Sequence, residues 1–162
     1  MRYSKEHVLG AHAGLTKMTP PFEGGCECGG VRYRCTSAPF WSTSCYCRDC
    51  QKQGASACTT AFTIRASAFV LLAGELLEFT SQAESGNTVS RMRCRHCGVW
   101  VFAQRSNKPA WRSVIASTLD DPDGFVLISN AFISSAPSWA AINPDIMQFE
   151  RMPEDELPGF TS

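Results

Sequence analysis

The chain contains 162 residues, of which 44% are hydrophobic, and its 15 Lys and Arg balance its 15 Asp and Glu to a formal net charge of +0. This size and composition are typical of one globular domain and exclude a chain that is disordered over most of its length. The neutral charge argues against nucleic acid as a partner, since binding it needs a surplus of cations, and no apolar run is long enough to cross a membrane.

The two ends of the chain differ in character from its middle. Residues 1–21 carry charges where a signal peptide needs a continuous apolar stretch, so we expect an N-terminal tail and a cytoplasmic protein. Residues 151–162 are acidic and contain proline, and we expect a second tail there. Residues 22–150 are expected to form the one folded domain.

Short strands are predicted in the first half of this domain. Val31–Cys35 alternates apolar and charged residues, which places Cys35 on a buried face and favours a core role for its thiol. The β-branched and aromatic segment Ala57–Ile64 predicts a further strand. Ala68–Leu72 and Leu76–Phe79 flank an Ala-Gly-Glu sequence, which predicts a β-hairpin.

Short strands are also predicted in the second half of the domain. Thr88–Cys94 and Val99–Phe102 bracket a C-x-x-C turn and predict a second hairpin. Trp111–Leu119 and Phe125–Ile133 are β-rich and are separated by a turn sequence at residues 120–124. Because no segment shows a long 3.6-residue period, the sequence predicts a mainly β fold.

Nine cysteines are present, and seven of them lie in tight clusters. The odd number and the lack of a secretion signal disfavour a disulfide framework, whereas C-x-C and C-x-x-C spacings are typical of metal ligands in a reducing compartment. The clustered residues are Cys26 and Cys28, then Cys45, Cys47 and Cys50, and then Cys94 and Cys97, while Cys35 and Cys58 stand alone.

Two of the clusters are pairs that together supply four thiolates. Residues i and i+2 of an extended segment point to the same side, so Cys26 and Cys28 can present both sulfurs to one ion. A C-x-x-C turn often needs a residue that accepts a positive φ, and Gly98 follows Cys97. Together with Cys94, these cysteines make up the closed four-thiolate set of a structural zinc site.

The remaining cluster supplies three ligands. Three protein ligands and an open fourth position are the pattern of a reactive zinc site. One alternative is a second structural site that is closed by Cys58, His96 or an acidic side chain. Another is a redox-active Cys47-x-x-Cys50, which is weaker because such a motif should begin a helix after a strand and because Cys45 fits a metal better.

The clusters belong to longer motifs that occur in a recognisable order. They are Gly25-Cys26-Glu27-Cys28-Gly29-Gly30-Val31-Arg32-Tyr33, Cys45-Tyr46-Cys47-Arg48-Asp49-Cys50, Cys94-Arg95-His96-Cys97-Gly98 and Leu119-Asp120-Asp121-Pro122, followed by Trp139. In this order the sequence resembles the glutathione-dependent formaldehyde-activating enzyme and centromere protein V family. It departs from that family at Tyr46, where relatives commonly carry His, and at Arg93, where an aromatic residue often stands.

The resemblance implies an Mss4-like fold of antiparallel sheets stapled by zinc. It also implies two zinc ions, one structural ion on Cys26, Cys28, Cys94 and Cys97 and one on Cys45, Cys47 and Cys50. In the family's name-giving member the second site lies where glutathione binds. The reaction there is the addition of formaldehyde to the thiol, which belongs to the carbon–sulfur lyase class.

We therefore expect a zinc-dependent enzyme that acts on a small thiol or thiol adduct, such as glutathione or S-hydroxymethylglutathione. The candidate proton carriers are Asp49, His96 and Tyr46. The alternatives are a zinc-stabilised binding module without catalysis and a sensor of thiols or metals. Asp120 and Asp121 are expected to be turn residues, and the tryptophans, including Trp139, are expected in the core or in the wall of a pocket, with the core preferred.

Overall fold

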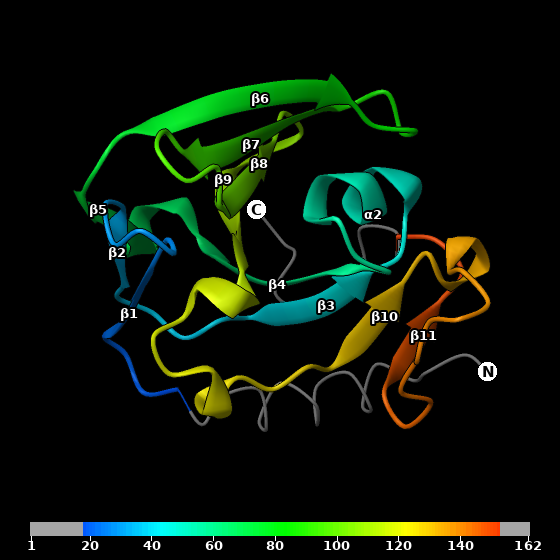
Figure 1. The fold of residues 1–162 in the computed structure, drawn as a ribbon. Coiled ribbons are helices and arrows are strands. Elements are labelled where there is room, and N and C mark those ends of the chain that lie inside the picture. The colour runs from blue at the N-terminus through cyan, green and yellow to red at the C-terminus, as the bar shows by residue number, and fades with distance from the viewer. Residues whose placement is uncertain (1–17, 153–162) are drawn as a thin grey trace.

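β-Strands are the main regular structure of the described chain. The computed structural model describes residues 18–152, so residues 1–17 of the expected N-terminal tail and residues 153–162 of the expected C-terminal tail lie outside this range. No helix in the described part is long and apolar enough to span a membrane. The elements, shown in Figure 1, are β1 (Phe22–Gly25), β2 (Arg32–Cys35), β3 (Trp41–Cys45), α2 (Arg48–Gly54), β4 (Thr59–Arg65), η1 (Ala66–Ala68), β5 (Phe69–Ala73), β6 (Leu76–Gln82), β7 (Thr88–Cys94), β8 (Trp100–Arg105), β9 (Lys108–Ile115), η2 (Ala116–Thr118), η3 (Pro122–Gly124), β10 (Ser129–Ala131), η4 (Ile133–Ser135) and β11 (Met147–Phe149).

The strands form two sheets, which confirms the predicted mainly β fold. One sheet has three strands in the order β1-β2-β5, and the other has eight in the order β11-β10-β3-β4-β9-β8-β7-β6. All pairings are antiparallel except those of β10, which runs parallel to both β3 and β11. Parallel neighbours need long connections, and the chain supplies one between β3 and β10 and another between β10 and β11.

The main hydrophobic core lies where the two sheets pack together. Tyr33 and Cys35 from β2 meet Phe62 and Ile64 from β4, and all four side chains are fully buried. Their alternation along each strand places every second residue inward. The buried position predicted for Cys35 is thus confirmed, and its pKa is raised to about 12 by burial, so its thiol is protonated and inert.

The hairpin predicted from Ala68–Leu72 and Leu76–Phe79 is wrong. Both segments are strands, but β5 pairs with β2 and β6 pairs with β7, so the turn between them connects the two sheets. Gly74 makes this crossing with a φ of +93°, and a Cβ there would lie 2.3 Å from the carbonyl oxygen of Gly30. Turn composition alone does not distinguish a crossing from a hairpin.

The structure also contains a short helix that the sequence pattern does not reveal. Helix α2 has seven residues and follows β3 almost directly, with the Cys47 sulfur accepting a hydrogen bond from the Cys50 N–H at its first turn. Figure 1 shows α2 between β6 and β7 on one side and β3 and β4 on the other. By contrast, the expected strand at Phe125–Ile133 is reduced to the three residues of β10, while the turn at 120–124 is confirmed by η3.

Candidate metal sites

The four-cysteine cluster consists of Cys26, Cys28, Cys94 and Cys97. Its first two members lie in the turn after β1, and the other two lie at the turn between β7 and β8. The four sulfurs all lie within 4.8 Å of one another, with 3.4 Å between Cys26 and Cys28 and 3.7 Å between Cys28 and Cys94. Sulfurs bound tetrahedrally to zinc are about 3.8 Å apart, so this donor set fits a closed zinc site.

Backbone N–H groups point at these sulfurs. Val31 N–H donates to the Cys26 sulfur at 3.2 Å, and His96 N–H donates to the Cys94 sulfur at 3.4 Å. A hydrogen bond from the Val99 N–H is the main reason that the pKa of Cys97 is lowered to about 6. Such bonds favour the thiolate form, which is the form that binds metal.

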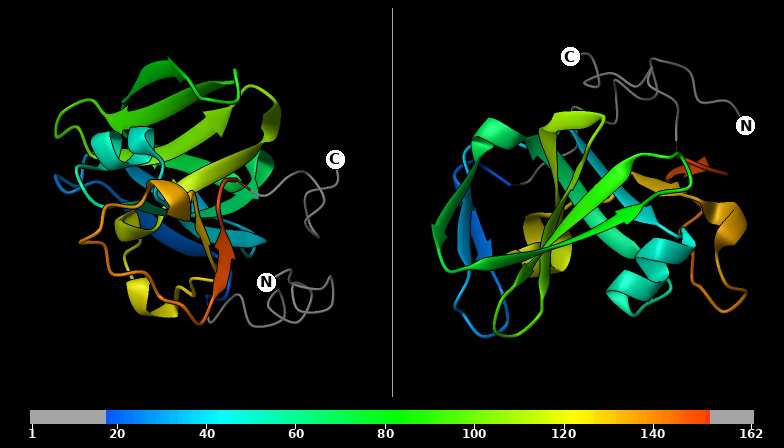
Figure 2. Two further views of the ribbon diagram at one scale, coloured as in Figure 1. Left: turned by 90° about the vertical axis from the view of Figure 1, so that its right-hand side faces the viewer. Right: turned by 90° about the horizontal axis from the view of Figure 1, so that it is seen from above.

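The three-cysteine cluster consists of Cys45, Cys47 and Cys50. The first ends β3, the second caps α2, and the third lies in the first turn of that helix. The three sulfurs lie within 4.8 Å of one another, and no fourth His, Cys, Asp or Glu ligand atom from residues 18–152 joins them. The cluster lies on the opposite side of the molecule from the β1–β2 turn, as the two orientations in Figure 2 also show.

Hydrogen bonds fix α2 to β4, to η4 and to the loop that precedes the helix, and thereby hold the three sulfurs together. Thr59 at the start of β4 donates its hydroxyl to the Cys50 carbonyl at 2.9 Å. The buried side chain of Gln51 donates to the carbonyl oxygens of Tyr46 and Ser135, the second at 2.9 Å. The cluster is therefore preformed by the fold.

The thiols of this cluster interact strongly. Hydrogen bonds, chiefly from the Cys45 thiol, lower the pKa of Cys47 to about 2. The same contacts raise the pKa of Cys45 to about 12, chiefly through Cys47, and raise that of Cys50, chiefly through Cys45. Three such thiols share their protons and give up all of them only when a cation compensates the charge, which is the behaviour of a metal-ligand set.

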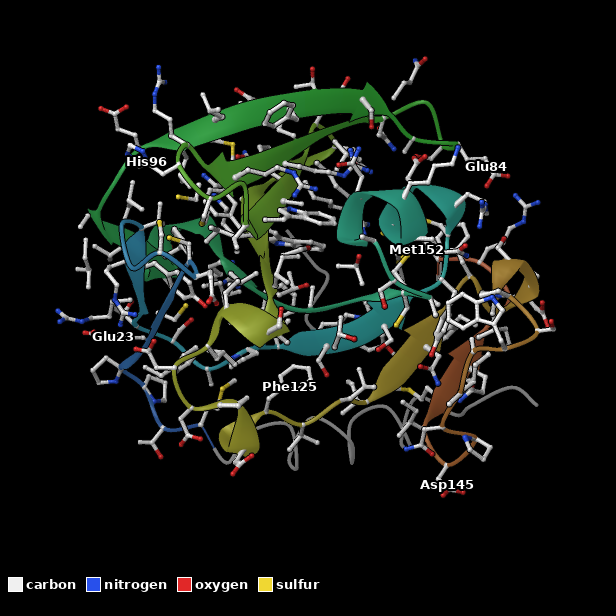
Figure 3. All side chains as sticks on the ribbon, viewed as in Figure 1. Glu23, Glu84, His96, Phe125, Asp145 and Met152 are labelled. Atoms are coloured by element: carbon white, nitrogen blue, oxygen red, sulfur yellow. The ribbon has the colours of Figure 1, made fainter. Side chains whose placement is uncertain are left out.

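The residues suggested as a closing ligand lie elsewhere. His96 is in the exposed β7–β8 turn of the four-cysteine cluster, far from α2 in Figure 3. Cys58 is outside the three-cysteine cluster, and its thiol adjoins the Tyr46 hydroxyl. Burial, with a smaller effect of Cys58, raises the pKa of Tyr46 to about 12, so the phenol stays protonated at neutral pH. Asp49 is exposed in the first turn of α2.

Of the two reasons given against a redox-active Cys47-x-x-Cys50, the structure supports only one. Cys47-x-x-Cys50 does begin a helix directly after a strand, contrary to the expectation from the sequence. The inclusion of Cys45 as a third sulfur, however, agrees with the metal interpretation.

Arg91, Arg93 and Trp100 form a group of side chains beside α2 that the sequence motifs do not identify. Arg93 on β7 donates from Nη2 to the Gln53 carbonyl at 2.7 Å, and from Nη1 to the Gly98 carbonyl at 3.0 Å, so it connects α2 with the β7–β8 turn. The guanidinium carbons of Arg91 and Arg93 each lie 5.5 Å from the ring centroid of Trp100. Burial, together with the charge of Arg91, lowers the pKa of Arg93.

The tryptophans are not all in the core. Trp41 and Trp100 are buried as expected, whereas Trp139 is 74% exposed in the long connection between η4 and β11. The core position preferred for Trp139 is therefore wrong, because an aromatic residue gives no sign of its burial when no periodic strand surrounds it.

Comparisons with known proteins agree with this architecture. A sequence model of a family described as glutathione-dependent formaldehyde-activating enzyme matches residues 21–135, a range that contains both cysteine clusters. The fold is similar to the crystal structure of a Rhodobacter sphaeroides protein, with a TM-score of 0.51 and 19% sequence identity over 78% of this chain and 98% of that one. No curated protein matches the sequence.

Proposed function

Since the chain belongs to the glutathione-dependent formaldehyde-activating enzyme family, we propose that it is a zinc-dependent enzyme of the carbon–sulfur lyase class that acts on a small thiol or thiol adduct. The observation that carries this proposal is the three-cysteine cluster, whose sulfurs lie within 4.8 Å of one another without a fourth ligand from the described chain. Glutathione or its formaldehyde adduct is the substrate that the family suggests.

The four-cysteine cluster takes a structural role in this proposal. Its sulfurs come from the β1–β2 turn and the β7–β8 turn and would hold one zinc ion between the two sheets. Four thiolates complete the tetrahedral coordination of zinc and leave no position for a substrate. The free energy of binding this ion adds directly to the stability of the fold.

The three-cysteine cluster takes the catalytic role. Zinc held there by Cys45, Cys47 and Cys50 would lower the pKa of a substrate thiol and keep the thiolate near an electrophilic carbon. The chain's own contribution is to hold the three sulfurs in place through α2. Asp49 is the exposed carboxylate beside the cluster, whereas the Tyr46 hydroxyl stays protonated at neutral pH and can donate or accept a hydrogen bond there without carrying a charge.

The proposal is tested by replacing zinc with cobalt and titrating the protein with glutathione. We expect the absorption bands of the cobalt at the three-cysteine cluster to change as the substrate sulfur binds, while those of the four-thiolate site stay constant. A Cys47→Ser variant should keep the four-thiolate spectrum and lose the response. A spectrum of the unmodified protein that glutathione and 2-mercaptoethanol leave unchanged would refute the enzyme and favour the zinc-stabilised binding module.

A further inference from the structure

Strand β5 forms an open edge of the three-stranded sheet. It pairs with β2 on one side, and no strand of residues 18–152 pairs with it on the other. The N–H and C=O groups along such an edge can bind a strand of another chain.

This edge lacks the charges and prolines that usually protect a free strand. Val70, Leu71 and Leu72 are 41%, 43% and 42% exposed, and they are three of the five exposed large apolar side chains in the described chain. Residues 66–74 contain no charged residue and no proline. By contrast, the edge strand of the other sheet, β6, carries Glu78 and three further polar residues, which discourage pairing.

The register between β2 and β5 shows which backbone groups point to the open edge. The Thr36 N–H donates to the Ala68 carbonyl, and Arg34 pairs with Val70 in the same register, which shifts only beyond Leu71. Bonded and non-bonded pairs alternate along antiparallel strands, so Val70 directs its N–H and C=O groups toward β2. The residues on either side of Val70 therefore direct theirs to the open edge.

These outward groups match the same groups of a second copy. The Phe69 N–H is bonded to the Ala66 carbonyl, which leaves the Phe69 carbonyl and both backbone groups of Leu71. In an antiparallel pair centred on Val70, Phe69 lies opposite Leu71 of the second copy. Each Leu71 N–H then donates to the Phe69 carbonyl across the interface, which gives two hydrogen bonds related by a two-fold axis.

The charges at the two ends of β5 favour this antiparallel pairing with a second copy. Arg65 is exposed and makes no ion pair with the acidic residues of the described chain, and Glu75 is 74% exposed at 3.4 Å from Arg95. Arg65 and Glu75 are each five residues from Val70, in opposite directions. Antiparallel pairing about Val70 therefore brings opposite charges together at both ends, whereas parallel pairing brings like charges together.

We propose that the chain forms a dimer in which the β5 strands of two copies pair antiparallel about Val70. The pairing joins the two three-stranded sheets into one six-stranded sheet and covers the apolar side chains of β5. A two-fold contact uses the same edge of both copies, so the assembly closes at two subunits. Because α2 and the three-cysteine cluster lie away from β5 in Figures 1 and 2, the dimer leaves them uncovered and does not depend on the proposed reaction.

The dimer is tested by analytical ultracentrifugation of the zinc-loaded full chain over a range of concentrations. We expect a monomer–dimer equilibrium with a dissociation constant of roughly 10–100 µM, because one strand from each copy makes an interface at the small end of specific complexes. Sedimentation as a monomer at every concentration up to about 1 mM would overturn the proposal.

Two lysine variants locate the contact. Val70 lies opposite its own copy at the axis, so Val70→Lys places two like charges face to face and should weaken the dimer at least about 10-fold. Phe79 is 50% exposed on β6, so Phe79→Lys makes the same change on the other sheet's edge and should leave the dissociation constant unchanged. An unchanged constant in Val70→Lys, or loss of the dimer in Phe79→Lys, would overturn the assignment to β5.

The direction of pairing is tested by exchanging the charges at the ends of β5. Arg65→Glu should weaken the dimer about 3- to 10-fold, because it turns two exposed attractive contacts into repulsive ones. Adding Glu75→Arg should restore most of the affinity. An equal loss in the single and double variants would overturn the antiparallel pairing. If Val70→Lys does not fold, this exchange at two exposed positions decides whether β5 is the contact.

Discussion

Cys97 and Cys47 carry the same side chain but should differ in what they contribute to stability. We expect Cys97→Ser to unfold the domain at ordinary temperature, because it removes one of four ligands that join the two sheets. Cys47→Ser should leave most of the fold intact and remove the second metal ion. Thermal melting followed by circular dichroism, together with the zinc content of each variant, checks both results.

An unchanged melting curve for Cys97→Ser would contradict the structural role of the four-cysteine cluster. Global unfolding of Cys47→Ser would contradict the division between a structural and a reactive ion.

Among single residues, the sequence identifies the cysteines that could bind metal, but it does not identify the arginine that is buried. The spacing of a C-x-x-C motif is local, so the seven clustered cysteines could be recognised and divided four and three before their positions were known. Arg91 has no such signal. Its burial follows only from the pairing of β7 with β6 and β8, which no local pattern specifies.

Among the secondary-structure elements, the crossing between β5 and β6 depends on Gly74. Gly74 and Gly86 both have a positive φ, of +93° and +81°, so alanine is strained at either position. Only at Gly74 would the added Cβ meet another segment, at 2.3 Å from the Gly30 carbonyl oxygen. We expect Gly86→Ala to cost about 1 kcal/mol in the free energy of unfolding and Gly74→Ala to cost at least about 2 kcal/mol more.

Urea denaturation of the two variants measures this difference. Equal costs would show that the chain can shift at the crossing, and would contradict a tight approach between the β5–β6 connection and the turn after Cys28.

The strands were predicted more successfully than their pairing. Alternation and β-branched residues are local properties, and they located β2, β4 and β7. The partner of β5 was misassigned because the same Gly-containing turn can close a hairpin or connect two sheets. Helix α2 is not predicted from the sequence, because its seven residues form only about two turns, and this is too short for a 3.6-residue period to be recognised.

At the scale of the whole molecule, two cysteine clusters that could each hold a metal ion lie on opposite sides of a two-sheet fold and supply different numbers of sulfurs. Residue patterns predict the mainly β fold and the division of the cysteines, and the family resemblance implies the same ligand sets, but the group of Arg91, Arg93 and Trp100 beside α2 emerges only when β3, β4 and β7 are placed around that helix.

X-ray absorption at the zinc edge of the protein purified under mild reducing conditions tests the central claim most directly. We predict two zinc ions per chain, with seven protein sulfurs shared between them and one oxygen or nitrogen at the second ion, replaced by an eighth sulfur when glutathione is added. One ion per chain, or a second ion whose coordination glutathione does not alter, would contradict this prediction.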